Sequence, residues 1–353
     1  MAILQIKDQI QYQEIIHEIY MCQFQEDPKM EQEISAASRK KMYEDVEYNV
    51  SLLTIALELE EEKIFENYAR WLYQLLCSLM TSLSRERVRD QMTEHYTLLG
   101  SHLEKYVEES HRPMLQSLIE RAIAVTEEEC RNSSLPDLDK PVKYKEEMQE
   151  YLNSLLHADT RKALYLLPEY IQRGIPLSDV YVDIVGATLN NIGERWHQHL
   201  ITVDQEHFST SIAQLSISQL YPMIFHRERK EKKILVTCVG SELHEAGARM
   251  VADLFEYSGW DSVYLGAAVP PEFVLSAIEL HNPDLVALSV TMPQHLIICK
   301  DTVTQIRDKY PSLPIAVGGK AFESADKIWK NWRVDVYTQD ARELVKWAED
   351  TLQ

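Results

Sequence analysis

The sequence lacks the features that would place it outside the cell or in a membrane. Its five cysteines are scattered and include no Cys-x-x-Cys spacing, which argues against a disulfide framework and a structural zinc site. No apolar run reaches the ~18 residues that a membrane-spanning helix needs. The first residues show no basic segment followed by an apolar core, so we expect no signal peptide. We therefore expect a soluble protein of the reducing cytoplasm.

Positive charge is also scarce. The chain has 36 Lys and Arg against 56 Asp and Glu, a formal net charge of −20. Duplex DNA would repel such a chain unless one of its faces were strongly basic. The one sizeable basic run, RERKEKK at 227–233, contains two glutamates and is typical of a solvated linker. We expect no nucleic-acid partner.

The first 131 residues are poor in the residues that interrupt helices. They contain one glycine, Gly100, and two prolines, Pro28 and Pro113. Apolar residues recur there at helical spacing and should line one helix face: Phe65, Tyr68, Leu72, Leu75, Leu76 and Leu79. We predict an all-helical domain of four or five helices over residues 1–131, followed by a polar linker at 131–141.

The remaining 212 residues divide into two further domains. Residues 142–229 predict a second helical domain, interrupted near Gly174 and Gly193. From residue 230 onward, short apolar runs alternate with helical patterns, which predicts a flavodoxin-like or Rossmann-like sheet of five parallel strands. The predicted strands are 234–239, 262–266, 285–290, 314–319 and 334–337. The predicted helices begin near Leu243, Pro271, Gln294, Ala321 and Asp340.

Ligands of such sheets bind beyond the carboxyl ends of the strands, where the strand order reverses. The loop after the first strand, Gly240–Gly247, carries His244 with Glu242 two residues before it. A histidine in that position can bind a metal through one ring nitrogen while a carboxylate holds the other. The alternative is that His244 merely caps a helix.

Two other loops should contribute to the same crevice. Ser289 and Thr291 follow the third strand and offer hydroxyl groups. Gly318 and Gly319 follow the fourth, where missing side chains would let a ligand approach the backbone. Together with the histidine loop, these groups suit a large planar metal cofactor with a nucleotide-like tail.

These three loops resemble the cobalamin-binding domain of the methionine-synthase type, whose pattern is Asp-x-His-x-x-Gly, then Ser-x-Leu or Ser-x-Thr, then Gly-Gly. His244 and Gly247 match the first motif, whereas Glu242 replaces its aspartate. The resemblance implies that His244 is the lower axial ligand of cobalt and displaces the dimethylbenzimidazole of the cofactor. That tail would then lie beside Ser289 and the two glycines. The exchange of aspartate for glutamate puts the strength of the ligand in doubt.

The second helical domain carries a further motif. Trp196, His197, Glu206 and His207 have the Trp-x9-Glu-His spacing of light-sensing adenosylcobalamin proteins of the CarH type. The resemblance implies a four-helix-bundle cap in which Trp196, Glu206 and His207 contact the adenosyl group. It also implies that His197 binds cobalt after light breaks the cobalt–carbon bond. The neighbouring His199 has no matching role, and we expect it to be exposed.

The N-terminal helices loosely resemble globin-like regulatory domains, including those of photocobilins, which pair cobalamin with a bilin. Asp45, Tyr48, Tyr68 and Trp71 could line a pocket for biliverdin or another tetrapyrrole; the alternative is that the aromatic residues belong to the core. His95 and His102 lie seven residues apart on one helix face and could face a heme, although histidines of this kind are more often surface residues.

These observations favour a cobalamin-binding light sensor without enzymatic activity. It would form a homo-oligomer, a dimer or tetramer, and signal to a protein partner. One alternative is a corrinoid methyl carrier for a methyltransferase, which would need an accessible upper face rather than a lid of Trp, Glu and His. Another is a cobalamin-level sensor that does not respond to light.

Overall fold

The computed structural model describes residues 9–26, 35–132, 135, 137–138, 140–225, 228–323, 325 and 328–352. The chain divides into two compact units, Met1–Leu135 and Pro136–Gln353, and each is considered separately. Residues 133, 134, 136 and 139 of the expected linker and residue 227 of the basic run lie outside the described part.

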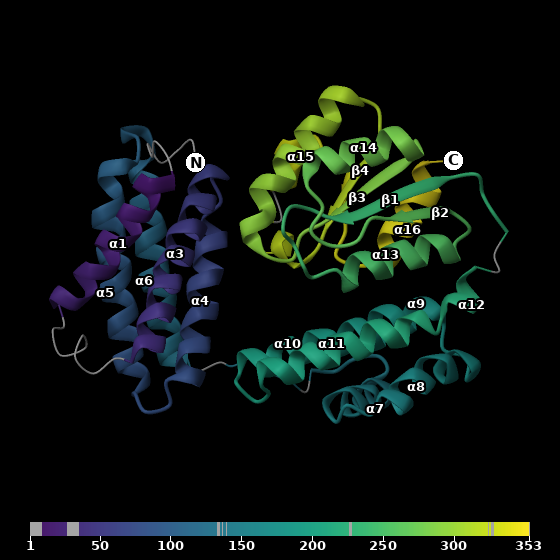
Figure 1. Cartoon of the computed structure of the whole chain (residues 1–353), viewed down its shortest axis with the longest axis horizontal. Helices are drawn as coiled ribbons and strands as arrows, with labels where there is room; N and C mark the ends of the chain where they lie inside the picture. Colours follow the sequence, from purple (N-terminus) through teal and green to yellow (C-terminus); the bar gives the residue numbers. More distant parts are fainter. Residues whose placement is uncertain are drawn as a thin grey trace. The chain divides into compact units, whose positions relative to one another are not determined.

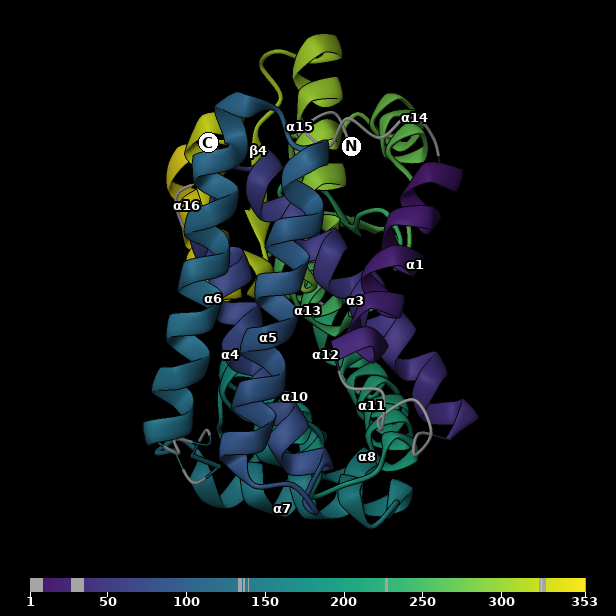
Figure 2. The ribbon, with the colours of Figure 1, turned by 90° about the vertical axis from the view of Figure 1, so that its left-hand side faces the viewer.

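The N-terminal unit is built from helices, as predicted. They are α1 (Gln9–Glu26), α3 (Ala36–Glu58), α4 (Glu62–Leu79), α5 (Arg85–Leu103) and α6 (Arg112–Asn132), with short 3₁₀ turns between α5 and α6. Serine side chains cap the first turns of α3 and α5, where backbone N–H groups lack helical partners. Helices α4, α5 and α6 pack side by side (Figure 2).

The expected apolar face of α4 is buried over most of its length. Phe65, Tyr68 and Leu72 are buried in the core of this unit. Leu75 and Leu76 are only partly buried, and Leu79 is 48% exposed. The burial of this face therefore decreases toward the end of the helix at Leu79.

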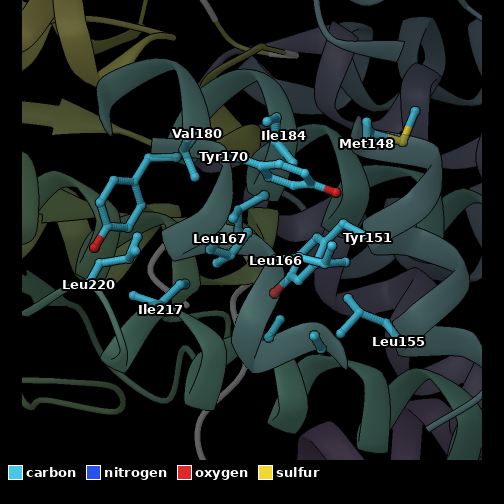
Figure 3. Close-up of a cluster of buried hydrophobic side chains, with 14 of the residues drawn as sticks. Met148, Tyr151, Leu155, Leu166, Leu167, Tyr170, Val180, Ile184, Ile217 and Leu220 are labelled. Carbon is cyan, nitrogen blue, oxygen red and sulfur yellow. The ribbon is translucent and has the colours of Figure 1, made fainter. Parts of the chain in front are cut away.

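The second unit begins with the predicted four-helix bundle, which we call the cap. Its helices are α7 (Lys145–Leu156), α8 (Thr160–Gln172), a long third helix and α11 (Val203–Ser218). The third helix consists of α9 (Leu177–Asp179), a π-helical segment (Val180–Gly186) and α10 (Ala187–His197); a short α12 (Tyr221–Ile224) follows α11. Figure 3 shows the cap core, where Tyr151 and Tyr170 lie among leucine and isoleucine side chains.

The predicted parallel sheet follows. Its strands are β1 (Lys233–Cys238), β2 (Asp261–Tyr264), β3 (Leu285–Ser289), β4 (Ile315–Gly318) and β5 (Val336–Tyr337), in the order β2-β1-β3-β4-β5. All neighbouring strands are parallel. Figure 1 shows α13 (Ala246–Tyr257) and α16 (Ala341–Thr351) on one face, with α14 (Pro271–His281) and α15 (Leu296–Lys309) on the other. The fold prediction is confirmed.

One predicted helix is wrong. The segment from Ala321 forms two 3₁₀ stretches, Lys320–Glu323 and Ile328–Trp332, rather than an α-helix; residues 324, 326 and 327 lie outside the described part. The backbone N–H of Ala321 donates to the carbonyl oxygen of Val290, just beyond β3, and the N–H of Phe322 donates to Gly319. These bonds tie the segment to the sheet in a tight turn, which favours a short 3₁₀ stretch over a longer α-helix.

The cap is joined to the sheet by buried contacts. Leu254 of α13 belongs to the cap core. The hydroxyl group of the buried Tyr181 donates to Asp253 of α13 over 2.8 Å. From α16, the Arg342 guanidinium reaches Asp179 at 2.9 Å and Asp183 at 2.8 Å.

None of the described helices combines the length and apolar character that a bilayer crossing requires.

Candidate cofactor site

The three predicted loops meet at one edge of the sheet. Cys238, the last residue of β1, lies level with Ser289 at the end of β3. Ser289 in turn lies level with Gly318 at the end of β4. In the order β2-β1-β3-β4-β5, the chain runs from β1 to β2 in one direction across the sheet and from β3 to β4 in the other. Such sheets bind ligands at the point where the direction reverses, between β1 and β3.

Glu242 is the centre of this edge. Its side chain is fully buried, and it accepts hydrogen bonds from the imidazole of His244 at 2.6 Å and the backbone N–H of His244 at 3.0 Å. Its second oxygen accepts the backbone N–H groups of Thr291 at 2.9 Å and Met292 at 2.8 Å. One carboxylate therefore joins the loop after β1 to the loop after β3.

The charge on Glu242 is stabilised by these donors. Burial on its own would raise the pKa of the carboxyl group, but the hydrogen bonds from His244, Met292 and Thr291 outweigh burial and lower it to about 2. A carboxyl group with a lowered pKa stabilises the fold fully above its ordinary pKa of 4.5. That contribution is lost as the pH falls through about 2.

His244 is held by Glu242 and still faces solvent. The hydrogen bond from its Nδ1 to Glu242 raises the pKa of the imidazole, while burial acts in the opposite direction and the nearby charge of Glu206 adds to the rise. The side chain is 58% exposed. Since Nδ1 is engaged, Nε2 is the nitrogen that remains for a metal.

The surroundings of His244 fit a corrinoid. A Cβ atom built on Gly247, at the start of α13, would meet no atom of the protein within 4 Å, so a broad ligand could lie against this turn. Among the residues that the model describes, no group of three or more His, Cys, Asp or Glu could hold a metal ion. A metal at His244 would need its other ligands from a cofactor, and a corrin ring supplies four equatorial nitrogens.

The glycines and Thr291 lie at this edge, as predicted from the strand ends, and each also makes contacts within the chain. Gly319 has φ 101°, and a Cβ there would lie 2.3 Å from the carbonyl oxygen of Val290. A Cβ on Gly318 would lie 3.3 Å from the carbonyl oxygen of Thr338. Both glycines therefore serve close packing within the chain. The contact of Thr291 with Glu242 is made by its backbone N–H.

The four cap residues lie at the end of α10 and the start of α11. Glu206 contacts His207 at 2.5 Å and accepts a hydrogen bond from Thr210 at 2.9 Å. His207 is 73% exposed. Trp196 is partly buried against the cap core, whereas His197 is 4% exposed.

Two polar contacts join this part of the cap to the sheet loops. Gln214 of α11 donates to Glu245, the residue after His244, at 3.0 Å. Glu194 of α10 lies 3.7 Å from Lys320, directly after the two glycines, and 3.9 Å from His197. The helices that carry the four cap residues, α10 and α11, are thus in contact with the loops that carry His244 and the two glycines. His199 is exposed, as predicted.

One neighbour of the site was not predicted. His295, in the turn before α15, is half-buried and close enough to Glu242 and His244 for their charges to act on it. Burial is the main cause of its lowered pKa. The sequence offered one signal, a histidine six residues after Ser289, but the interpretation of this stretch as helix concealed it.

The N-terminal candidates separate into two groups. Tyr68 lies 5.5 Å from Tyr48 and 6.3 Å from Trp71 between ring centroids, so the structure brings these three rings into one cluster. Burial raises the pKa of Tyr68, and the charge of Asp45 adds to the rise, which places Asp45 beside the cluster.

The two histidines of α5 are partly buried and contact α1, contrary to the expectation of surface residues. His95 Nδ1 contacts the amide of Gln23, and burial lowers the pKa of His95 to about 4. His102 uses both ring nitrogens, one with Cys22 at 3.4 Å and one with the Leu98 carbonyl at 3.0 Å. Neither nitrogen of His102 is left for a heme iron.

Comparison with known families defines the class of this site. Residues 232–344 match the B12 binding domain, and residues 148–221 match a second family model with the same description. The sheet and the cap thus each match a B12 binding domain model, and these matches indicate a cobalamin or another corrinoid as the cofactor.

Several individual proteins resemble the chain, among them a transcriptional repressor and a corrinoid protein. The HTH-type transcriptional repressor CarH of Myxococcus xanthus is 28% identical over 167 residues, which cover 46% of this chain and about half, 54%, of the relative. The monomethylamine corrinoid protein of Methanosarcina barkeri shares the fold, with a TM-score of 0.52 and 20% identity. That match covers 59% of this chain and 99% of the other.

Replacing Glu242 with Gln should lower the pKa of His244 in the cofactor-free protein. A neutral amide does not favour the protonated imidazole as a carboxylate does, so the pKa should return toward the ordinary value of about 6.5. NMR titration of protein with labelled histidine measures this shift. Glu206→Gln is the matched control and should have a smaller effect, because Glu206 acts only through its charge. A His244 pKa that is the same in wild type and Glu242→Gln would contradict this description of the site.

Proposed function

We propose that this chain is a light sensor that binds adenosylcobalamin between the cap and the sheet. The observation that carries the proposal is that α11 of the cap lies close to the His244 loop of the sheet domain. The charge of Glu206 on α11 reaches His244, and Gln214 of the same helix bonds to the adjacent Glu245. The Trp-x9-Glu-His motif and the similarity to CarH support the same function.

In this proposal, His244 would hold the cofactor through its Nε2, with its Nδ1 fixed by Glu242. The Gly318–Gly319 turn and Ser289 border the space for the tail. Trp196 and Glu206 would cover the upper face and exclude water. Adenosylcobalamin would supply a cobalt–carbon bond that light breaks.

His197 is the residue that would respond to the change. It is buried in the cap, beside Glu194, and must leave that position to serve as an upper ligand. Glu194 also contacts Lys320 on the sheet side. Movement of His197 would therefore disturb a contact between the cap and the sheet, which gives the change a route to the rest of the protein.

We further propose that the chain has no enzymatic activity of its own. Its output would be a change in homo-oligomeric state or in contact with a protein partner. The net charge of −20 supports a protein partner over a nucleic acid.

A methyl carrier is the second candidate. The fold likeness to the monomethylamine corrinoid protein is compatible with it. A carrier must present its methyl group to other enzymes, so side chains closing the upper face would obstruct it. A cobalamin sensor that ignores light would use the same site without the step at His197.

Illumination of the loaded protein separates these functions. Wild-type chain carrying adenosylcobalamin should give a photoproduct whose absorption spectrum differs from that of illuminated free cofactor, because His197 then supplies a nitrogen ligand. His197→Ala lacks this ligand, so its photoproduct should differ in absorption from that of the wild type. His199→Asn is the matched control and should behave like wild type, since His199 is exposed and its φ of 56° suits asparagine.

Identical photoproducts from wild type and His197→Ala would overturn the light-sensing role of His197. They would favour one of the two alternatives. A photoproduct that depends on His197 would exclude a sensor that ignores light.

We also propose that the aromatic cluster of the N-terminal unit binds a bilin, with Asp45 available to pair with its pyrrole nitrogens. Biliverdin added to the purified chain should then develop a band at longer wavelength than free biliverdin. Asp45→Asn should weaken that band, whereas Asp90→Asn on α5 should not. A spectrum identical to that of free biliverdin would contradict the proposal.

A further inference from the structure

Two cysteines of the N-terminal unit lie at matching levels on packed helices. Cys77 is in the last turn of α4, and Cys130 is in the last turn of α6. Both are free thiols and partly exposed.

The register between these two helices can be read from their polar contacts. Ser117 of α6 donates to Glu62 of α4 at 2.5 Å, and Gln74 of α4 donates to Glu129 of α6 at 2.9 Å. Both pairs are separated by 55 positions in the chain, so the helices run parallel with a constant offset. That offset places Cys77 within one helical turn of the level of Cys130.

The hydroxyl group of Tyr73 lies near both thiols. Burial raises the pKa of the Tyr73 hydroxyl group, and the thiols of Cys130 and Cys77 add to the rise, which places both thiols near this oxygen. The hydroxyl is itself fixed, because it donates to the backbone carbonyl of Arg85 at 3.1 Å. Two thiols that lie near one fixed oxygen, at matching levels of two packed helices, lie near each other.

A cationic donor stands beside the pair. The Arg85 guanidinium lies over the Tyr73 ring, 5.6 Å from its centroid, and its Nη2 donates to the carbonyl of Glu129 at 2.8 Å. Its Nε is buried and has no hydrogen-bond partner among the described residues. Burial raises the pKa of the Cys77 thiol, and the charge of Arg85 opposes this rise. An anionic sulfur formed during exchange would have this free N–H group as a donor.

The other cysteines have different surroundings. Cys238 and Cys299 are fully buried in the sheet domain, and burial raises the pKa of Cys238 to about 12. Cys22 contacts His102 in a different helix pair, α1 and α5. The juxtaposition of two accessible thiols therefore occurs once among the described residues.

We propose that Cys77 and Cys130 are a redox-responsive pair that forms a disulfide with low-molecular-weight disulfides such as oxidised glutathione. One thiolate attacks the oxidised glutathione, releases one glutathione thiolate and leaves a mixed disulfide. The second thiolate attacks the protein sulfur of that mixed disulfide and releases the second glutathione. The two protein thiols lose two electrons and two protons, and oxidised glutathione is reduced to two molecules of glutathione.

The bond would cross-link α4 and α6 two residues before α6 ends at Asn132. The chain then continues toward the cobalamin-binding unit. The disulfide would close a loop of roughly 50 residues and stabilise the N-terminal unit in its folded form. The oxidation state of the cell would thus act on the unit that we assign to regulation, independently of the cofactor site.

The test uses the purified full-length chain, reduced and then incubated with oxidised glutathione. Digestion without reductant, followed by mass spectrometry, should yield a peptide pair joined through Cys77 and Cys130. The oxidised protein should also unfold at a higher temperature than the reduced protein. Cys130→Ser should abolish both effects and leave glutathione on Cys77. Cys22→Ser is the matched control and should retain both.

Separate glutathione adducts on Cys77 and Cys130 of the wild type, with no linked peptide, would overturn the proposal. So would a link between Cys77 and a cysteine of a second copy, seen as a covalent dimer on a non-reducing gel. The linked peptide is measured in the wild type, so the test does not depend on how well the variants fold.

Discussion

The buried carboxylate of Glu242 is the interaction on which the cofactor site depends. A buried charge is costly unless donors surround it, and here four hydrogen bonds come from two different loops. The lowering of its pKa to about 2 corresponds to a stabilisation on the order of 3 kcal/mol at neutral pH. That energy fixes the loops after β1 and β3 against each other and orients His244, so its Nε2 has a fixed position without any bound group.

The cap is attached to the sheet domain by contacts of unequal strength. The hydrogen bond of Tyr181 with Asp253 is buried, and the ion pair of Arg342 with Asp179 is partly buried. Nearer the site, Lys320 and Glu194 are more exposed and 3.7 Å apart, and exposed ion pairs contribute little. A change at His197 would therefore break the weak contact first, while the strong ones hold the cap in place.

The sequence predicts the fold well because each parallel strand is a short apolar run, and the crevice follows from where those runs end. It predicts the pairing of Glu242 with His244, two residues apart. It does not predict the contacts of Glu242 with the N–H groups of Thr291 and Met292, since backbone groups carry no sequence signal. For the same reason, the sequence does not predict that Gly319 also makes room for the carbonyl group of Val290. The helix predicted from Ala321 is wrong because the segment is shaped by its hydrogen bond to Val290 beyond β3. Such a tertiary contact cannot be read from the local sequence pattern.

The identity of the lower cobalt ligand tests the central claim most directly. The chain should be loaded with cobalamin, reduced to the cobalt(II) form and studied by electron paramagnetic resonance, with and without nitrogen-15 in its histidines. If His244 binds cobalt, the nitrogen splitting changes to the nitrogen-15 pattern in the labelled protein, and His244→Ala loses that change. A splitting that is the same with and without the label would mean that the cofactor keeps its own base, and would contradict the account.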